Sequence, residues 1–243
     1  MDNRLHESIF LELQKGILKG KYPPGSRFPS ERDLARRYNV SRSTIREAMG
    51  KLAKSGLVET RPQSGTYVSE YQTKASLDLL IEIMQRGGEV DSDILLSLME
   101  TRSVIELHAA RVALENFSPD DIDYLKKIVT DEKANAENPE LIAECDYALH
   151  QFIMQKSGNF VIQLIFNSFK PVYRFYTGYF FSMPGSIKKT IQQHEAFVRF
   201  AELKNMPAAV EKLAEALDYG KNRVVETLGI RHERKMIRLV AGI

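Results

Sequence analysis

The chain has 243 residues, of which 43% are hydrophobic and 27% charged, a balance typical of a globular protein with a buried core. A single cysteine, Cys145, excludes an internal disulfide framework and a cysteine-rich zinc ribbon, and favours a reducing, cytoplasmic setting. No run approaches the roughly 18 apolar residues that a membrane-spanning helix needs, so we expect neither secretion nor a membrane partner.

The net charge is unevenly distributed. Residues 1–70 contain 13 Lys and Arg against 8 Asp and Glu, a net charge of +5, whereas the rest of the chain contains 21 against 24, a net charge of −3. A basic segment before a mildly acidic body is typical of a polyanion-binding part joined to a part with another task. An ordinary solvated surface is the alternative interpretation.

Three helices are predicted in the basic segment. Residues 5–19 place apolar side chains on one helical stripe, and the glycines and prolines that follow end the helix. Ser30 is a candidate N-cap for a second helix through Tyr38. Ser41 is a candidate N-cap for a third helix, which Gly56 ends.

Two short β-prone runs follow the third helix, at residues 57–60 and 66–68. The sequence RPQSG joins them, so they predict a small hairpin. Three helices and a hairpin in this order predict a winged helix-turn-helix.

Strand patterns nearly vanish from about residue 76 onward. Helical periodicity bounded by Gly, Pro and Asn predicts helices over residues 76–86, 92–116, 119–136, 140–157, 160–182, 186–204 and 207–228. The sequence therefore predicts a mainly α protein with an N-terminal winged helix-turn-helix over 1–70, a linker at 71–76, and an all-α antiparallel helical bundle over 77–243.

The third predicted helix carries chemistry suited to DNA. A helix that enters the major groove presents its N-terminal residues to base edges and phosphates. Arg42 and Arg46 stand one turn apart on the face opposite Ile45, and an arginine can donate two hydrogen bonds to guanine O6 and N7. The small hydroxyls of Ser41, Ser43 and Thr44 can reach phosphates. An exposed helix that happens to carry two arginines is the alternative.

Two further parts fit the same interpretation. Arg32 is near the start of the preceding helix, where the first helix of such a pair crosses the DNA backbone. The loop over 61–66 would be the wing, whose small residues allow a close approach to the duplex.

Residues 28–68, FPSERDLARRYNVSRSTIREAMGKLAKSGLVETRPQSGTYV, resemble the DNA-binding domain of GntR-type bacterial regulators, with the resemblance covering about residues 10–69. It implies that operator DNA is contacted by Arg32, Arg42, Thr44 and Arg46, with Ser64, Gly65 and Thr66 at the wing tip. Wings of this family often carry Gly-x-Gly, whereas this one has Gln63-Ser64-Gly65, which predicts a stiffer tip.

The body contains a candidate metal site. Asp146 and His150 are four residues apart and project from one face of a helix, and His194 is on another helix. One carboxylate and two imidazoles are suitable ligands for a divalent metal. The alternative is that the histidines only cap helices or form hydrogen bonds with buried polar groups of the core.

The body also resembles the effector domain of the FadR branch of the GntR family, over about residues 76–228. The resembling stretches are LMETRSVIELHAARVALENFSPDDIDYL, DYALHQFIMQKSGNFVIQLI and HEAFVRFAELKNMPAAVEKL. Many relatives bind a divalent metal through one Asp and three His, and for this chain we expect zinc or nickel. The first three correspond to Asp146, His150 and His194, whereas the fourth falls at Ala216, which cannot ligate. Water or a carboxylate effector would complete the shell, and a vestigial site is the alternative.

Other features resemble the acyl-CoA-binding members of that branch, which lack the metal. These are Asp146-Tyr147, the aromatic run at 172–181 and Tyr219-Gly220, although residues 221–223 do not match. Arg102 corresponds to an arginine that relatives often point into the effector cavity, where its fork suits a carboxylate. An ion pair with Glu106, four residues on, is the alternative for Arg102.

An enzyme is not expected, because the chain contains no ExxH, HExxH or GxSxG motif and no phosphate-binding glycine loop. A metal-dependent helical-bundle enzyme is the remote alternative. We expect a homodimeric, ligand-responsive transcription regulator that reads a palindromic operator in double-stranded DNA. Its effector would be a small carboxylate, with acyl-CoA as the alternative.

Overall fold

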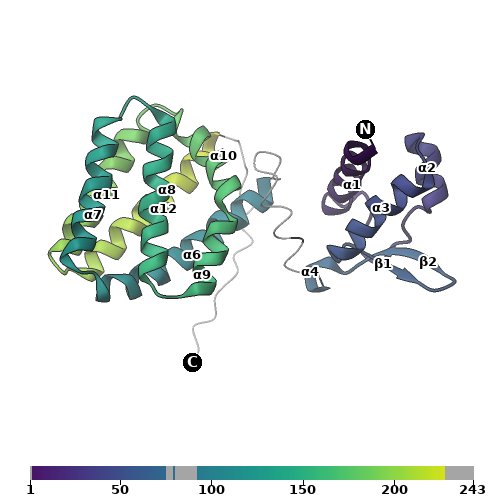
Figure 1. Cartoon of the computed structure of the whole chain (residues 1–243), viewed down its shortest axis with the longest axis horizontal. Helices are drawn as coiled ribbons and strands as arrows, with labels where there is room; N and C mark the ends of the chain where they lie inside the picture. Colours follow the sequence, from purple (N-terminus) through teal and green to yellow (C-terminus); the bar gives the residue numbers. More distant parts are fainter. Residues whose placement is uncertain (1, 75–78, 80–91, 228–243) are drawn as a thin grey trace. The chain divides into compact units, whose positions relative to one another are not determined.

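The computed structural model describes residues 2–74, 79 and 92–227 (Figure 1). The helix predicted over 76–86 lies almost entirely outside these residues. Contacts within the chain form two compact units, Met1–Ile83 and Met84–Ile243, which we call the head and the body.

The head is a winged helix-turn-helix, as predicted. It contains α1 (Asp2–Leu18), α2 (Glu31–Tyr38), α3 (Arg42–Lys54), β1 (Val58–Arg61) and β2 (Gly65–Val68). The two strands pair antiparallel, with Val58 opposite Val68 and Arg61 opposite Gly65 (Figure 1).

Local capping explains why α2 and α3 begin where the sequence predicts. The side chain of Ser30 accepts a hydrogen bond from the Asp33 amide, and that of Ser41 accepts one from the Thr44 amide, each at 3.2 Å. A hydroxyl at this position satisfies one of the unpaired amides of the first turn. Gly56 follows α3 with φ +74, a conformation that glycine adopts without steric strain.

The apolar stripes of α1 and α3 pack together to form the core of the head. Ile17, Ile45 and Leu52 are fully buried. Helix α4 (Tyr71–Lys74) occupies the first four residues of the predicted linker, and Tyr71 packs against this core. The packed part of the head therefore extends beyond residue 70.

The body consists of helices throughout the residues that the structure describes. They are α6 (Ser92–Asn116), α7 (Pro119–Ala134), α8 (Pro139–Lys156), α9 (Phe160–Ser168), α10 (Lys170–Phe181), α11 (Ser186–Glu202) and α12 (Met206–Thr227). None of the described helices is both long and apolar enough to cross a membrane.

The prediction of one helix over 160–182 is wrong. Helix α9 ends at Ser168, with Phe169 as its C-cap, and Pro171 lies in the first turn of α10. Proline lacks an amide hydrogen and disfavours helical backbone at the preceding residue, so it is tolerated at a helix start and not inside one.

Five body helices form a closed ring through their contacts. Around the ring, α6 contacts α8, α8 contacts α7, α7 contacts α11, α11 contacts α12, and α12 contacts α6 again. Their apolar stripes build one core, with Leu125, Leu149, Ile153, Phe197 and Leu213 almost fully buried. Polar side chains that face inward are therefore brought together from several helices.

Candidate metal centre and DNA-contacting surface

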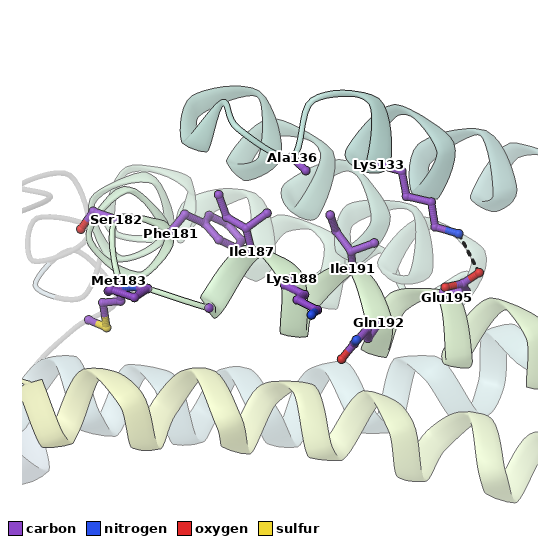
Figure 2. A pocket seen from close by; sticks show the side chains of 12 residues that line it. Lys133, Ala136, Phe181, Ser182, Met183, Ile187, Lys188, Ile191, Gln192 and Glu195 are labelled. Atoms are coloured by element: carbon purple, nitrogen blue, oxygen red, sulfur yellow. Dashed lines mark hydrogen bonds and ion pairs between the residues drawn. The ribbon is translucent and has the colours of Figure 1, made fainter.

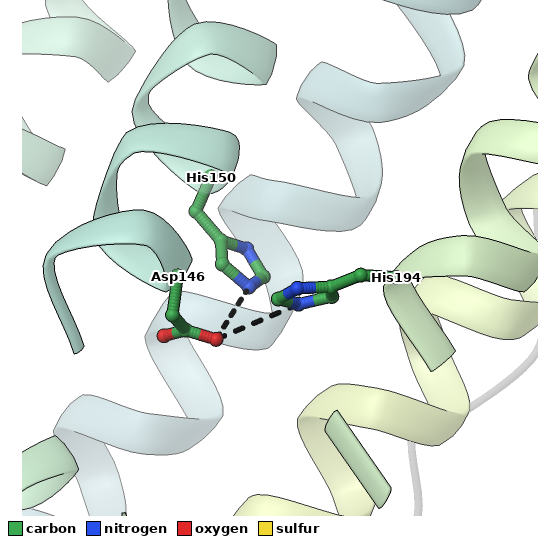
Figure 3. Close-up of side chains that lie close together, drawn as sticks. All are labelled: Asp146, His150 and His194. Carbon is green, nitrogen blue, oxygen red and sulfur yellow. Dashed lines mark ion pairs between the residues drawn. The ribbon is translucent and has the colours of Figure 1, made fainter. Parts of the chain in front are cut away.

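The three predicted metal ligands lie together inside the ring. Asp146 and His150 come from α8 and His194 comes from α11 (Figure 3). Their exposed fractions are 6%, 2% and 1%. Asp146 Oδ1 lies 3.8 Å from His150 Nε2 and 3.5 Å from His194 Nε2. One ligand atom from each residue falls within 4.8 Å of the others, which a single ion could bridge.

A fully buried carboxylate contacts Nδ1 of each imidazole, on the side away from the candidate metal position. Glu106 of α6 contacts His150 Nδ1, and Glu132 Oε1 of α7 lies 2.8 Å from His194 Nδ1. A carboxylate at Nδ1 fixes the ring orientation and the tautomer, and leaves Nε2 to act as ligand. Histidines that bind metals in proteins usually have this support.

One atom at the centre has no hydrogen bond. His194 Nε2 is buried and makes none, which is unfavourable for a polar atom. Burial alone would lower the pKa of His194, but the charge of Glu132 and its hydrogen bond raise it. The inward-facing nitrogen, the carboxylate oxygen of Asp146 and the second imidazole fit a divalent cation in their chemistry.

Five side chains form a closed polar circuit around this centre. Arg102 Nε donates to Glu106, which contacts His150, which faces Asp146. The hydroxyl of Tyr173 donates to Asp146 Oδ2, and Arg102 Nη2 donates back to that hydroxyl at 3.3 Å. The ion pair of Arg102 with Glu106 is therefore present, and Arg102 also lines the central cavity described below, so its effector role stays a prediction.

The ionisation states in the circuit have clear physical causes. Burial alone would raise the pKa of Glu106, but Arg102 and His150 outweigh it and lower that pKa. Glu106 in turn raises the pKa of Arg102, against the effect of burial. Burial raises the pKa of Tyr173 well above its ordinary value. The circuit thus contains a carboxylate, a guanidinium and a neutral phenol as hydrogen-bond donor.

A small central cavity adjoins the three ligands. Its volume is about 20 Å³, close to what one water molecule occupies. Besides Asp146, His150 and His194, its walls are Arg102, Tyr176, Thr177, Phe180, Thr190, Ala216, Leu217 and Gly220. Ala216 therefore lies on the wall at which the resemblance leads us to expect a fourth ligand.

Tyr219 does not line the central cavity. Its ring packs edge-on against Phe180, with the ring centres 5.8 Å apart. Successive residues of a helix point about 100° apart, so the neighbouring Gly220 faces the cavity instead.

Two other cavities lie nearby in the body. A small apolar one, also about 20 Å³, shares Arg102, Tyr173 and Tyr176 with the central region. A larger one, about 700 Å³, is an outer cavity lined by α7, the turn before α11 and α11 itself (Figure 2). Its walls include Phe181, Met183, Ile187 and Ile191, and the Lys133–Glu195 ion pair stands at one side. It contains none of the predicted metal or effector residues.

In the head, the structure separates the predicted DNA-contacting residues into two groups. Arg32, Arg42, Ser43 and Arg46 are exposed on α2 and α3, and Ser41 is exposed directly before α3. Thr44 is buried, and its hydroxyl lies 2.8 Å from that of Ser41, so these two residues shape the start of the helix.

Sequence reasoning did not single out Glu31, which contacts two of these arginines. Its carboxylate accepts hydrogen bonds from Arg46 Nε at 3.4 Å and Nη2 at 3.3 Å, and lies 3.9 Å from Arg42 Nη2. Glu31 begins α2, and the arginines belong to α3.

The wing tip is restrained by its neighbours. Ser64 Oγ lies 2.8 Å from the Tyr67 hydroxyl, and Thr66 O accepts the Phe28 amide at 2.8 Å. Gly65 has φ +120, and a Cβ there would lie 3.3 Å from Arg27 Nε. Gln63 has φ +60, a left-handed conformation that costs a non-glycine residue about 1 kcal/mol or more.

Residues 5–68 match the family described as bacterial regulatory proteins, gntR family, and residues 97–219 match the FCD domain. The chain is 31% identical over 167 residues to the HTH-type transcriptional regulator Mce2R of Mycobacterium tuberculosis, which covers 69% of each protein. It is 29% identical over 193 residues to a fatty acid metabolism regulator protein of a Shewanella species, which covers 79% of this chain and 78% of the relative.

Among solved structures, Lar of Listeria monocytogenes matches with a TM-score of 0.56 at 16% identity, over 93% of this chain and 97% of that one. McbR/YncC of E. coli matches with a TM-score of 0.53 at 17% identity, over 92% and 98%. These two similarities support the fold alone. The family matches and the named relatives identify a transcription regulator and not an enzyme. The chain therefore belongs to the GntR family of bacterial regulators, with an FCD domain as its body.

Proposed function

We propose that this regulator belongs to the FadR branch, acts in the cytoplasm as a homodimer, and releases or binds a palindromic operator in response to a small carboxylate held with one zinc or nickel ion. The observation that carries the metal part is the buried Nε2 of His194, which faces Asp146 and has no hydrogen bond. A symmetric dimer presents two heads, which suits two half-sites related by symmetry.

The side chains around the central cavity suit the ion, and because its volume is only about 20 Å³, the carboxylate would enter by displacing part of the cavity wall. Asp146, His150 and His194 would hold the ion, and Ala216 leaves one side of the site without a protein ligand. The ion would supply a Lewis-acidic position for a carboxylate oxygen. Arg102 would orient the same carboxylate through its planar fork, because its side chain lines the cavity.

In the head, we propose that Arg32, Arg42, Ser43 and Arg46 contact the duplex, with Ser64, Gly65 and Thr66 at the wing. Their support is the exposure of the four side chains on α2 and α3 and of Ser64, with Gly65 and Thr66 half-buried beside it on the hairpin. Ser41 and Thr44 would contribute through the start of α3. A typical coupling between effector and operator sites is about 1–3 kcal/mol, a change in operator affinity of about 5- to 150-fold.

An acyl-responsive regulator without metal is the second candidate, and one observation favours it. The outer cavity of about 700 Å³ has apolar walls and the exposed Lys188 among its lining residues. An acyl chain fits that volume and not the central cavity of about 20 Å³. Similarity to a relative named as a fatty acid metabolism regulator supports the same acyl-responsive candidate.

Operator release under defined ligands separates the two candidates. An operator would be obtained by selecting duplexes from a random pool with the wild-type protein, and its release followed by fluorescence anisotropy. Citrate, lactate or pyruvate would be added with zinc or nickel, and acyl-CoA without metal. His194→Ala should abolish a carboxylate response, whereas Ile187→Glu should abolish an acyl-CoA response.

The metal part has a direct test. Elemental analysis of protein purified without chelator should find up to one divalent ion per chain. If no ion is retained even after soaking in zinc or nickel, the metal proposal is wrong, whatever the operator-release experiment shows.

A further inference from the structure

A single carboxylate connects the two arginines that the head presents at the start of α3. Glu31 Oε1 accepts from Arg46 Nε at 3.4 Å, and Oε2 accepts from Arg46 Nη2 at 3.3 Å. Oε2 also lies 3.9 Å from Arg42 Nη2. An acidic side chain on a surface that meets phosphates is unfavourable for binding DNA, so its presence calls for a physical explanation.

Fold stability does not explain this contact. The side chains of Arg42 and Arg46 are 64% and 69% exposed, and that of Glu31 is 32% exposed. Ion pairs with this exposure contribute about 0–1 kcal/mol to folding. The contact therefore matters more for how the two arginines meet DNA than for the stability of the fold.

The contact uses one edge of the Arg46 guanidinium and leaves the other edge free. Glu31 takes the edge formed by Nε and Nη2, so each terminal nitrogen keeps an N–H to donate, and the side chain is 69% exposed. The terminal edge that these two nitrogens form can donate two parallel hydrogen bonds to guanine O6 and N7. A side chain held in this way loses less rotamer freedom when it meets a base.

The same carboxylate weakens binding that depends on phosphates alone. Random DNA attracts the head through phosphate charge, and a negative group between two arginines reduces that attraction. Hydrogen bonds to a base edge form only when Arg46 has the correct orientation, whereas a contact with a phosphate does not require that orientation.

We propose that Glu31 is a specificity-determining residue of the head: it orients Arg46 toward a base edge and penalises contacts made only with phosphates. This inference depends on DNA binding by the head and does not depend on the effector or the metal.

The test compares Glu31→Gln with Glu47→Gln, two variants that each remove one negative charge from the head. Glu47 is on α3, is 63% exposed and pairs with His6 instead of an arginine. Affinity for the selected operator and for a scrambled duplex of the same length would be measured by anisotropy over a range of salt concentrations. Thermal melting would verify that both variants fold.

For Glu31→Gln we expect tighter binding to the scrambled duplex, with a salt slope steeper by up to about 1. We also expect weaker binding to the operator, so that the ratio of the two affinities falls at least about fivefold. Glu47→Gln should change that ratio by less than about twofold. In an Arg46→Lys background, which lacks the fork, Glu31→Gln should no longer change the ratio more than Glu47→Gln does.

Equal ratios for the two glutamine variants would overturn the inference, as would an equal gain on both duplexes in Glu31→Gln. Failure of the underlying operator binding would be visible separately, because the wild-type protein would then enrich no sequence from the random pool.

Discussion

Nδ1 of His194 lies 2.8 Å from Oε1 of Glu132, and both side chains are almost completely removed from solvent. The carboxylate fixes the imidazole so that Nε2 faces Asp146. An orienting carboxylate from α7 thus acts on a ligand from α11 across the ring of helices.

Glu132→Gln should weaken binding of zinc or nickel by about 10- to 100-fold, because an amide orients the imidazole without its charge. Competition against a chromophoric chelator would measure the affinity. Glu195→Gln is the control, since Glu195 neighbours His194 but is exposed and pairs with Lys133. If both variants bind metal equally well, Glu132 has no part in the site.

Ala216→His should tighten metal binding at least about tenfold, because it supplies the ligand missing from the cavity wall. The same chelator competition would measure it. Ala214→His, two residues away on another face of α12, should leave the affinity unchanged. An Ala216→His protein that melts normally and shows no gain would argue against a metal at this position.

Gly220→Ala should lower the free energy of unfolding, because a Cβ at Gly220 would lie 2.2 Å from the Tyr176 hydroxyl. Overpacking typically costs about 1–3 kcal/mol, against a helix-propensity gain of up to about 1 kcal/mol. In a Tyr176→Phe background the nearest remaining ring atom is 3.5 Å away, so the same substitution should become neutral or stabilising. Urea unfolding of all four proteins would show this change of sign. Its absence would mean that α10 and α12 separate to admit the methyl group.

Asp121 should make the stability of the body pH-dependent. Burial alone would raise its pKa, but Lys156, 2.6 Å away, and the capping box with Ser118 lower it. A carboxyl whose folded pKa is depressed stabilises the fold above its unfolded pKa of about 3.9, and this contribution is lost as pH falls through the folded pKa. Asp121→Asn should therefore cost about 1–2 kcal/mol at pH 7 and progressively less below about pH 4.

Thermal or urea unfolding of Asp121→Asn between pH 3 and pH 7 would measure this trend. Asp123→Asn, an exposed change on the same helix, is the control. A constant difference between wild type and Asp121→Asn across the pH range would contradict the assignment.

Arg42→Ala and Arg46→Ala should each abolish specific operator binding, because each removes a fork from the exposed start of α3. A gel shift at protein concentrations that fully bind the operator in the wild type would test this. Lys54→Ala, at the other end of α3, should still shift the operator. Unchanged binding by both arginine variants would show that α3 is not the recognition helix.

Local interactions explain which elements could be predicted. Ser30 and Ser41 determine the starts of α2 and α3 within one turn of chain, so the sequence is sufficient there. The break at Phe169 had a local indication as well, in Pro171, but the strong apolar periodicity of the segment masked it.

Packing between distant segments explains what could not be predicted at the site. The spacing of Asp146 and His150 placed them on one face of a helix. The structure adds the carboxylates that contact the two histidines, Glu106 and Glu132. Glu132 follows Leu125, Ile128 and Val129 on one buried stripe, so a buried acid was visible in the pattern. Its contact with His194 spans 62 residues and depends on how α7 packs against α11. The contact of Glu31 with Arg46 likewise depends on how α2 packs against α3.

The closed ring of helices also sets the order in which the central cavity is built during synthesis. Asp146, His150 and His194 all leave the ribosome before α12, which carries Ala216 and Gly220 of the cavity wall and closes the ring against α6. A nascent chain therefore contains all three ligands before it contains the α12 side of the cavity wall. The contact between α6 and α12, the first and last of the body helices that the structure describes, is completed only when translation has passed residue 227.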